Sequence, residues 1–254
     1  MAPFSYKLCW LHNDYTVNFG ASKCQNSSSI VDSSSTPVCH NDCALYVKCK
    51  RAFELAGLPN NFWYGPDKMR VATEDVEAMA TTQHIRRNIK SFVKNGQNLW
   101  ICSDTQGNGK TYRAVTLACT YILHNVINNN YFDNMVRYVY IPKYVSDYEI
   151  IERYSFENEK RTQFLNNLES LYTSDLVIWD DLGYGSESRI ESVILRAIIN
   201  DRLNNNKSNI FISGKPMQQI STIVGRSLYD RIYGSSLLVN FRGPDMRTNT
   251  KYAY

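Results

Sequence analysis

The sequence predicts an α/β fold built on a five-stranded, largely parallel sheet, and two observations lead to this prediction. From about residue 60 of the 254-residue chain, short β-rich runs alternate with longer amphipathic stretches. Such alternation requires crossover connections, which make neighbouring strands parallel and cover both faces of the sheet with helices. In addition, a glycine-rich turn at 107–111 (GNGKT) separates one apolar run from one amphipathic stretch. This is the strand–loop–helix order of a single crossover unit.

Each element can be placed from the pattern of apolar residues. The predicted strands are Asn98–Cys102, Val136–Ile141, Asp175–Trp179, Asn209–Ser213 and Leu237–Phe241. Helical periodicity covers Gly109–Ile127, two pieces within Val145–Leu171, Glu187–Leu203, and short pieces within Met217–Tyr233. Asparagine runs at 128–130 and 204–206 are expected to stop two helices, because asparagine tolerates a left-handed backbone.

The composition narrows the class of protein. A formal net charge of +4 permits contact with nucleic acid without requiring it. The 18 tyrosines would suit either base stacking or half-buried packing positions. No apolar run approaches the ~18–20 residues of a membrane span, and the N-terminus lacks the layout of a secretory signal. We therefore expect a cytoplasmic protein with no membrane partner.

The stretch SDTQGNGKTYRA (103–114) predicts a phosphate-binding loop. It follows the apolar run NLWIC and opens an amphipathic helix, so backbone N–H groups converge at a helix N-terminus, where anions are favoured. Lys110 is expected to bridge the β- and γ-phosphates of ATP, and the Thr111 hydroxyl to bind Mg²⁺. The predicted nucleotide-binding residues of the loop are Gly107, Asn108, Gly109, Lys110, Thr111 and Tyr112.

Asp104 stands where the G-x-x-x-x-G-K-[ST] pattern has its first glycine. Aspartate is among the few residues that tolerate a positive φ, so the substitution is compatible with the loop. A carboxylate facing a triphosphate would weaken binding, and we therefore expect Asp104 to point outward.

A second acidic motif is predicted to complete the site. In SDLVIWDDLG (174–183), a continuous apolar run suited to a buried parallel strand ends in two aspartates. Asp180, at the end of a neighbouring strand, is expected to hold the Mg²⁺ shell, while Asp181 polarises the attacking water.

With these motifs the chain resembles the AAA+ ATPases, and within them the DnaC/DnaI-type replicative helicase loaders, including phage versions. GNGKT is similar to their Walker A motif and LVIWDD to their Walker B motif. The resemblance extends to three further segments: LAGLPNNFW (55–63), IFISGKPMQQI (210–220) and SLYDRIYGSSLLVNFRGPDMR (227–247).

The resemblance implies roles for several residues. Arg231 matches the arginine finger that reaches a neighbouring subunit's γ-phosphate, although an ion pair with Asp230 or Glu191 would also explain it. Arg247 matches the second-sensor arginine. The asparagine expected at the first-sensor position aligns with Gly214, which leaves the Ser213 hydroxyl nearby, so weak or partner-stimulated ATPase activity is expected.

The resemblance also implies an AAA+ core without a C-terminal helical lid, a site that a neighbour completes by self-association, and two partners, a hexameric replicative helicase and single-stranded DNA. A transposition-helper ATPase of the IstB type shares these motifs. A third reading is a nucleotide-insensitive replication adaptor with a vestigial loop. Segment 142–163 mixes basic and aromatic residues that would suit single-stranded DNA or an ordinary solvated helix pair.

The N-terminal fifth of the chain is cysteine-rich. Cys24, Cys39, Cys43 and Cys49 could close a tetrahedral Zn²⁺ site, with a [4Fe–4S] cluster or unligated thiols as the alternatives. A module this small, with few apolar residues to form a core, needs a metal or another cross-link to be stable. We therefore expect two domains, a Cys-rich module at 1–56 that contacts the helicase and an ATPase domain at 57–254.

Overall fold

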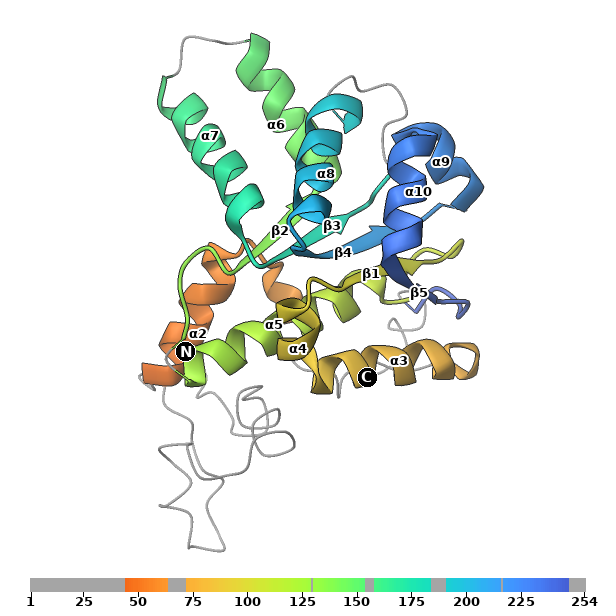
Figure 1. The fold of residues 1–254 in the computed structure, drawn as a ribbon. Helices are drawn as coiled ribbons and strands as arrows, with labels where there is room; N and C mark the ends of the chain where they lie inside the picture. The colour runs from red at the N-terminus through yellow and green to blue at the C-terminus, as the bar shows by residue number, and fades with distance from the viewer. Residues whose placement is uncertain are drawn as a thin grey trace, which may run out of the picture.

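The structure is a computed structural model and describes residues 44–63, 72–128, 130–153, 158–183, 191–215 and 217–246. A five-stranded sheet lies between two layers of helices (Figure 1), and every strand pair in it is parallel. The predicted α/β fold is therefore confirmed.

The strands follow the predicted apolar runs closely. They are β1 (Asn98–Cys102), β2 (Val136–Tyr140), β3 (Leu176–Asp180), β4 (Ser208–Ser213) and β5 (Ser236–Asn240). Predicted ends differ by one residue at most; for example, Ile141 begins a helix instead of closing β2. β1, β3 and β4 are buried along their whole length, which explains why their continuous apolar runs were easy to recognise.

The order of the strands in the sheet is β2-β3-β4-β1-β5. The sequence had suggested that β3, which ends in Asp180, lies next to β1. The strand order shows that it does not. Strand β4 lies between them, with Ser213 paired to Cys102 and Phe211 paired to Trp179. The tip of β4 thus lies between the loop that follows β1 and the acidic end of β3.

One face of the sheet is covered by α2 (Ala44–Leu55), α3 (Val76–Arg87), α4 (Ile89–Lys94) and α5 (Lys110–Ile127), the lower layer in Figure 1. Leu99 and Ile101 of β1 face this layer. Two 3₁₀ turns, η3 (Asn60–Phe62) and η5 (Thr73–Asp75), accompany these helices. α3 and α4 were not predicted.

The opposite face is covered by α6 (Ile141–Arg153), α7 (Asn158–Thr173), a π-helical turn η6 (Glu191–Leu195), α8 (Arg196–Asn204), α9 (Met217–Val224) and α10 (Arg226–Ser235). Trp100 of β1 and Trp179 of β3 point into this layer, so strand residues alternate between the two cores. α5 and α8 end at asparagines, as predicted. No helix that the structure describes is both long and apolar enough to cross a membrane.

Helix α2 packs against the rest of the described fold. Its buried residues Cys49 and Phe53 belong to the same apolar cluster as helix α5. The Ala56 carbonyl accepts a hydrogen bond from the Tyr138 backbone N–H at 2.8 Å, which attaches the end of the helix to the edge strand β2. Residues 44–56 of the predicted Cys-rich module therefore pack on the sheet, residues 1–43 lie outside the described part of the chain, and the division into two domains stays a prediction.

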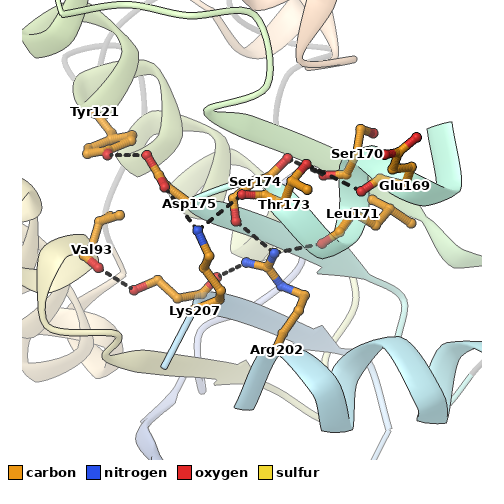
Figure 2. A network of polar contacts seen from close by, with 11 residues as sticks. Val93, Tyr121, Glu169, Ser170, Leu171, Thr173, Ser174, Asp175, Arg202 and Lys207 are labelled. Atoms are coloured by element: carbon orange, nitrogen blue, oxygen red, sulfur yellow. Dashed lines mark hydrogen bonds and ion pairs between the residues drawn. The ribbon is translucent and has the colours of Figure 1, made fainter. Parts of the chain in front are cut away.

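A buried arginine connects the N-terminal ends of β3 and β4 (Figure 2). Arg202 is fully buried in α8, and its guanidinium donates to the carbonyls of Leu171, Ser174 and Ser208 at 2.7, 2.8 and 2.6 Å. It also donates to the Asn209 side-chain oxygen at 2.7 Å. Four acceptors satisfy the buried cation, as burial of a charged group requires.

The segment after β5 is fixed at two points. The Asp75 carboxylate accepts hydrogen bonds from the backbone N–H groups of Arg242 and Gly243 at 2.6 and 3.0 Å. Further along, the Met246 N–H donates to the Gly107 carbonyl at 3.1 Å. The chain is therefore led from the edge of the sheet onto the glycine loop.

Candidate functional site

The glycine loop between β1 and α5 has a preformed shape. Gly107 and Gly109 adopt φ values of 72° and 90°, a region that favours glycine. The Ser103 hydroxyl oxygen accepts hydrogen bonds from the Thr105 N–H at 2.9 Å and the Asn108 side-chain amide at 2.6 Å. Side-chain bonds from within the loop thus hold it open at the N-terminus of α5.

Asp104 is exposed, as predicted, and is absent from the lining of the cavity described below. Its backbone does not use the left-handed region: among the described non-glycine residues, only Asp181 and Asn206 have a positive φ. The expectation that Asp104 replaces glycine by adopting such a φ was therefore wrong. The left-handed residues of the loop lie three and five positions later, at Gly107 and Gly109, where glycine is retained.

Lys110 begins helix α5 and is buried. Its ammonium group donates to the Thr105 carbonyl at 2.8 Å and to the Asn108 side-chain oxygen at 3.1 Å. The cation thus lies inside the curve of the loop, where the loop's own oxygens solvate it. Phosphate oxygens are stronger acceptors of the same donors, because charge-assisted hydrogen bonds are about twice as strong as neutral ones.

Thr111 and Asp180 meet directly. The Thr111 hydroxyl lies 3.0 and 3.2 Å from the two carboxylate oxygens of Asp180, although 69 residues separate them in the chain. Tyr138 of β2 donates its phenolic hydrogen to the same carboxylate at 2.5 Å, and the Asp181 N–H donates at 3.0 Å. Helix α5, strand β2 and the turn after β3 therefore orient a single carboxylate.

Burial raises the pKa of the Asp180 carboxyl, while hydrogen bonds from Tyr138 and Thr111 oppose the rise. Burial, together with the charge of Asp180, raises the pKa of Tyr138 far above its usual value, so its phenol remains a donor. Tyr138 had no predicted role. Only the pairing of β2 with β3, which places Tyr140 opposite Asp180, brings Tyr138 to this side of the sheet end.

A cavity of about 440 Å³ opens between the glycine loop and the tips of β3 and β4. Its volume is within the ~300–1,000 Å³ typical of ligand sites. Six of the predicted loop residues line it, together with Asp181. The lining residues without a predicted site role are Phe62, Gln106, Leu182, Gly183, Gly214 and Lys215.

These residues fit a magnesium–nucleotide complex. Main-chain N–H groups at a helix N-terminus and two lysines suit phosphates, and the hydroxyl of Thr111 and carboxylate of Asp180 are the oxygen ligands that Mg²⁺ prefers. Phe62 and Tyr112 pack edge to face, with ring centroids 6.0 Å apart, and offer an apolar wall for a base. Phe62 lies in the LAGLPNNFW segment, so the resemblance had marked its neighbourhood without giving it a role.

The predicted first-sensor hydroxyl points elsewhere. Ser213 is fully buried, and its hydroxyl oxygen accepts a hydrogen bond from the Trp100 indole N–H at 3.1 Å. It is not among the cavity-lining residues. Gly214 and Lys215, the next two residues, form the cavity wall at this position instead.

Arg231 is exposed on α10, and its guanidinium donates to the side-chain oxygens of Asn200 (2.7 Å) and Asn204 on α8. Asp230 pairs instead with Arg226 at 3.7 Å. The ion pair with Asp230 that was the alternative to a finger is therefore not formed. Arg247 follows Met246 and lies outside the described residues.

The predicted metal ligands in the N-terminal module cannot be assembled from the described residues. Cys24, Cys39 and Cys43 lie outside them, and Cys49 is buried in α2 within the apolar cluster. No group of three or more potential metal-ligating side chains gathers elsewhere in the described ranges. The zinc or iron–sulfur site thus stays a prediction.

Two of the basic and aromatic residues suggested for single-stranded DNA already have contacts within the chain. Lys143 forms an ion pair with Asp147 at 2.7 Å, and Tyr144 packs on Phe164 with ring centroids 5.1 Å apart. Arg161 is exposed on α7.

Comparisons with known proteins agree with this geometry. The family described as IstB-like ATP binding protein matches residues 72–253. The replicative helicase loader DnaC of Escherichia coli strain K12 is 25% identical over 162 residues, which are 63% of this chain and 58% of that protein. The chain thus spans about three-fifths of the length of the curated relatives it matches.

Two solved structures share the fold. The crystal structure of the DnaC helicase loader has a TM-score of 0.55 at 18% identity and covers 72% of this chain and 99% of that one. The replication initiator DnaA bound to AMPPCP and single-stranded DNA has a TM-score of 0.51 at 16% identity and covers 72% and 50%. At these identities the likeness concerns the fold.

Proposed function

The chain belongs to the IstB-like ATP binding protein family, and we propose that it is an ATP-dependent replicative helicase loader. ATP binding and hydrolysis would control its grip on a hexameric helicase and on single-stranded DNA. The similarity to DnaC relatives over 63% of the chain supports this choice among the functions of the family.

The observation that carries the proposal is the meeting of Lys110, Thr111 and Asp180 at one edge of the sheet. The Thr111 hydroxyl lies 3.0 Å from Asp180, and Lys110 lies in the curve of the loop beside it. A vestigial loop has no need of this arrangement. The geometry therefore favours nucleotide binding over the nucleotide-insensitive adaptor.

The residues of the chain have distinct parts in hydrolysis. The loop N–H groups and Lys110 bind and orient the phosphates, and Thr111 and Asp180 would hold Mg²⁺, which neutralises phosphate charge. Asp181, which lines the cavity, would orient the attacking water. Tyr138 fixes the carboxylate of Asp180.

Arg231 is proposed to complete the site of a neighbouring copy. Within one chain it rests on Asn200 and Asn204, at the surface of α8 and α10, and is absent from the cavity lining. An arginine that reaches a γ-phosphate in trans can raise the rate by roughly 10³–10⁵. Weak turnover in the isolated chain and stimulation on assembly follow, and Arg247 is proposed to act as a second arginine at the site.

The N-terminal module is proposed to contact the helicase and to bind Zn²⁺, or alternatively an iron–sulfur cluster, through Cys24, Cys39, Cys43 and Cys49. Metal analysis together with a visible spectrum distinguishes the two metals, because only the cluster absorbs in the visible range. The cytoplasm of a bacterial host, with the gene carried by a phage, is the setting that this role implies.

Nucleotide titration tests ATP binding. A labelled ATP analogue with Mg²⁺ should bind the wild-type chain, and Lys110→Ala should abolish binding. Lys143→Ala is the matched control, since Lys143 is exposed on α6 and paired with Asp147. Absence of binding to the folded wild-type protein would overturn the proposal.

A pull-down against the replicative helicase and against a transposase tests the partner. Capture of the helicase in an ATP-dependent manner supports loading. Capture of the transposase alone would favour the second candidate, a transposition-helper ATPase, which the family description supports.

A further inference from the structure

The tip of β4 faces both halves of the candidate site. Ser213 ends β4 opposite Cys102, the last residue of β1 before the glycine loop. On the other side, the Leu182 N–H donates to the Ile212 carbonyl at 2.8 Å, which holds the turn after Asp180 against the same strand. A side chain that follows Ser213 therefore enters the space between the loop and the acidic turn.

Neither Ser213 nor Gly214 offers a free polar side chain to the cavity. Gly214 has no side chain, and the hydroxyl of buried Ser213 is bonded to Trp100 on the other face of the strand. Lys215, one residue later, lines the cavity together with Lys110 and Asp181. Within the described residues, no carboxylate forms an ion pair with Lys215.

Charge and position together indicate what Lys215 contacts. Lys110 lies on the wall formed by the loop, whereas Lys215 lies on the wall formed by the tips of β3 and β4. A nucleotide whose first phosphates rest on the loop presents its terminal phosphate toward the second wall. A lysine ammonium is a compact charge with three donors on a flexible stem, which suits a terminal phosphate oxygen.

We propose that Lys215 binds the γ-phosphate of ATP and makes the site select ATP over ADP, in place of the polar side chain that position 214 lacks. This inference rests on the proposed ATP binding at the same site. Lys215 would act in the ground state and, as the γ-phosphate gains charge during transfer, in hydrolysis as well.

Separate titrations with ADP–Mg²⁺ and ATPγS–Mg²⁺ test the selectivity. Lys215→Ala should weaken ATPγS binding by about 10-fold or more, the usual size of a lost hydrogen bond between charged groups, and should leave ADP within about 2-fold of wild type. Lys215→Arg should retain most of the preference. The control is Lys207→Ala, at the opposite end of β4, which should change neither affinity.

A second variant distinguishes a lost phosphate contact from a general distortion of the site by Lys215→Ala. Gly214 has open space around the position of an added Cβ, and its φ lies outside the left-handed region, so asparagine fits there. Gly214→Asn in the Lys215→Ala background should restore ATPγS affinity without changing that for ADP. Equal losses for both nucleotides, or unchanged selectivity, would overturn the role of Lys215 while leaving ATP binding intact. Failure of wild type to bind either nucleotide would overturn both proposals.

Discussion

Replacing Arg202 by methionine is expected to destabilise the fold by about 3 kcal/mol without altering nucleotide affinity. Methionine keeps an unbranched apolar stem of similar length but removes the guanidinium. The carbonyls of Leu171, Ser174 and Ser208 then lose a donor each at 2.6–2.8 Å, and each loss in a buried site costs roughly 1–3 kcal/mol.

Two effects limit the total. The Asn209 side-chain oxygen keeps one donor, because the Trp179 indole N–H lies 3.0 Å from it. Removing a buried cation also returns part of its desolvation cost, which here lowers the pKa of Arg202 to about 9. Out of a total stability of roughly 5–15 kcal/mol, about 3 kcal/mol is still a large share.

Urea unfolding followed by tryptophan fluorescence measures the effect, with an expected fall in midpoint of about 1 M at an unchanged slope. Arg226→Met is the matched control: its side chain is 92% exposed and pairs with Asp230 at 3.7 Å, so less than about 1 kcal/mol should be lost. A loss below about 1 kcal/mol for Arg202→Met would refute the reasoning. So would a change in ATP affinity of the folded protein, because Arg202 lies at the end of the strands opposite the glycine loop.

Two further substitutions test the contacts that shape the site. Tyr138→Phe should lower stability by about 1.5–3 kcal/mol, since the buried Asp180 loses a 2.5 Å hydrogen bond; an unchanged melting temperature would contradict this. Gly243→Ala should lower stability by about 1–3 kcal/mol, because its Cβ would lie 2.4 Å from the Asp75 carboxylate, and it should also weaken ATP binding through the chain docked on the glycine loop. The control is Gly234→Ala in α10, where an added Cβ meets open space, and it should be neutral or stabilising. Thermal unfolding measures the stability of all three variants.

The sequence located most elements because their residues signal burial directly. NLWIC and LVIWD each contain four consecutive apolar residues, because both faces of these strands are covered, and a short continuous apolar run between polar residues is typical of a buried parallel strand. Helix α3 was missed for the opposite reason. Two of its four buried residues, Thr82 and Arg86, are polar, so its apolar periodicity is weak.

Parts of the site that are contiguous in the chain could also be predicted from the sequence. Gly107 to Thr111 act together because the chain itself holds them at the start of a helix, and that local geometry depends little on the rest of the fold. The closing segment was recognised as a resemblance, but the carboxylate that holds it, Asp75, lies 167 residues from Arg242 and could not be assigned from local pattern.

The sequence by itself therefore determined that a glycine loop at a helix N-terminus and an acidic strand end exist, because each is encoded in one short continuous segment. Only the tertiary structure decided that β4 separates them, that Tyr138 orients Asp180, and that Lys215 lines the space between them. Strand order depends on how whole faces pack against each other, and that free energy is spread over the two cores instead of residing in any one segment.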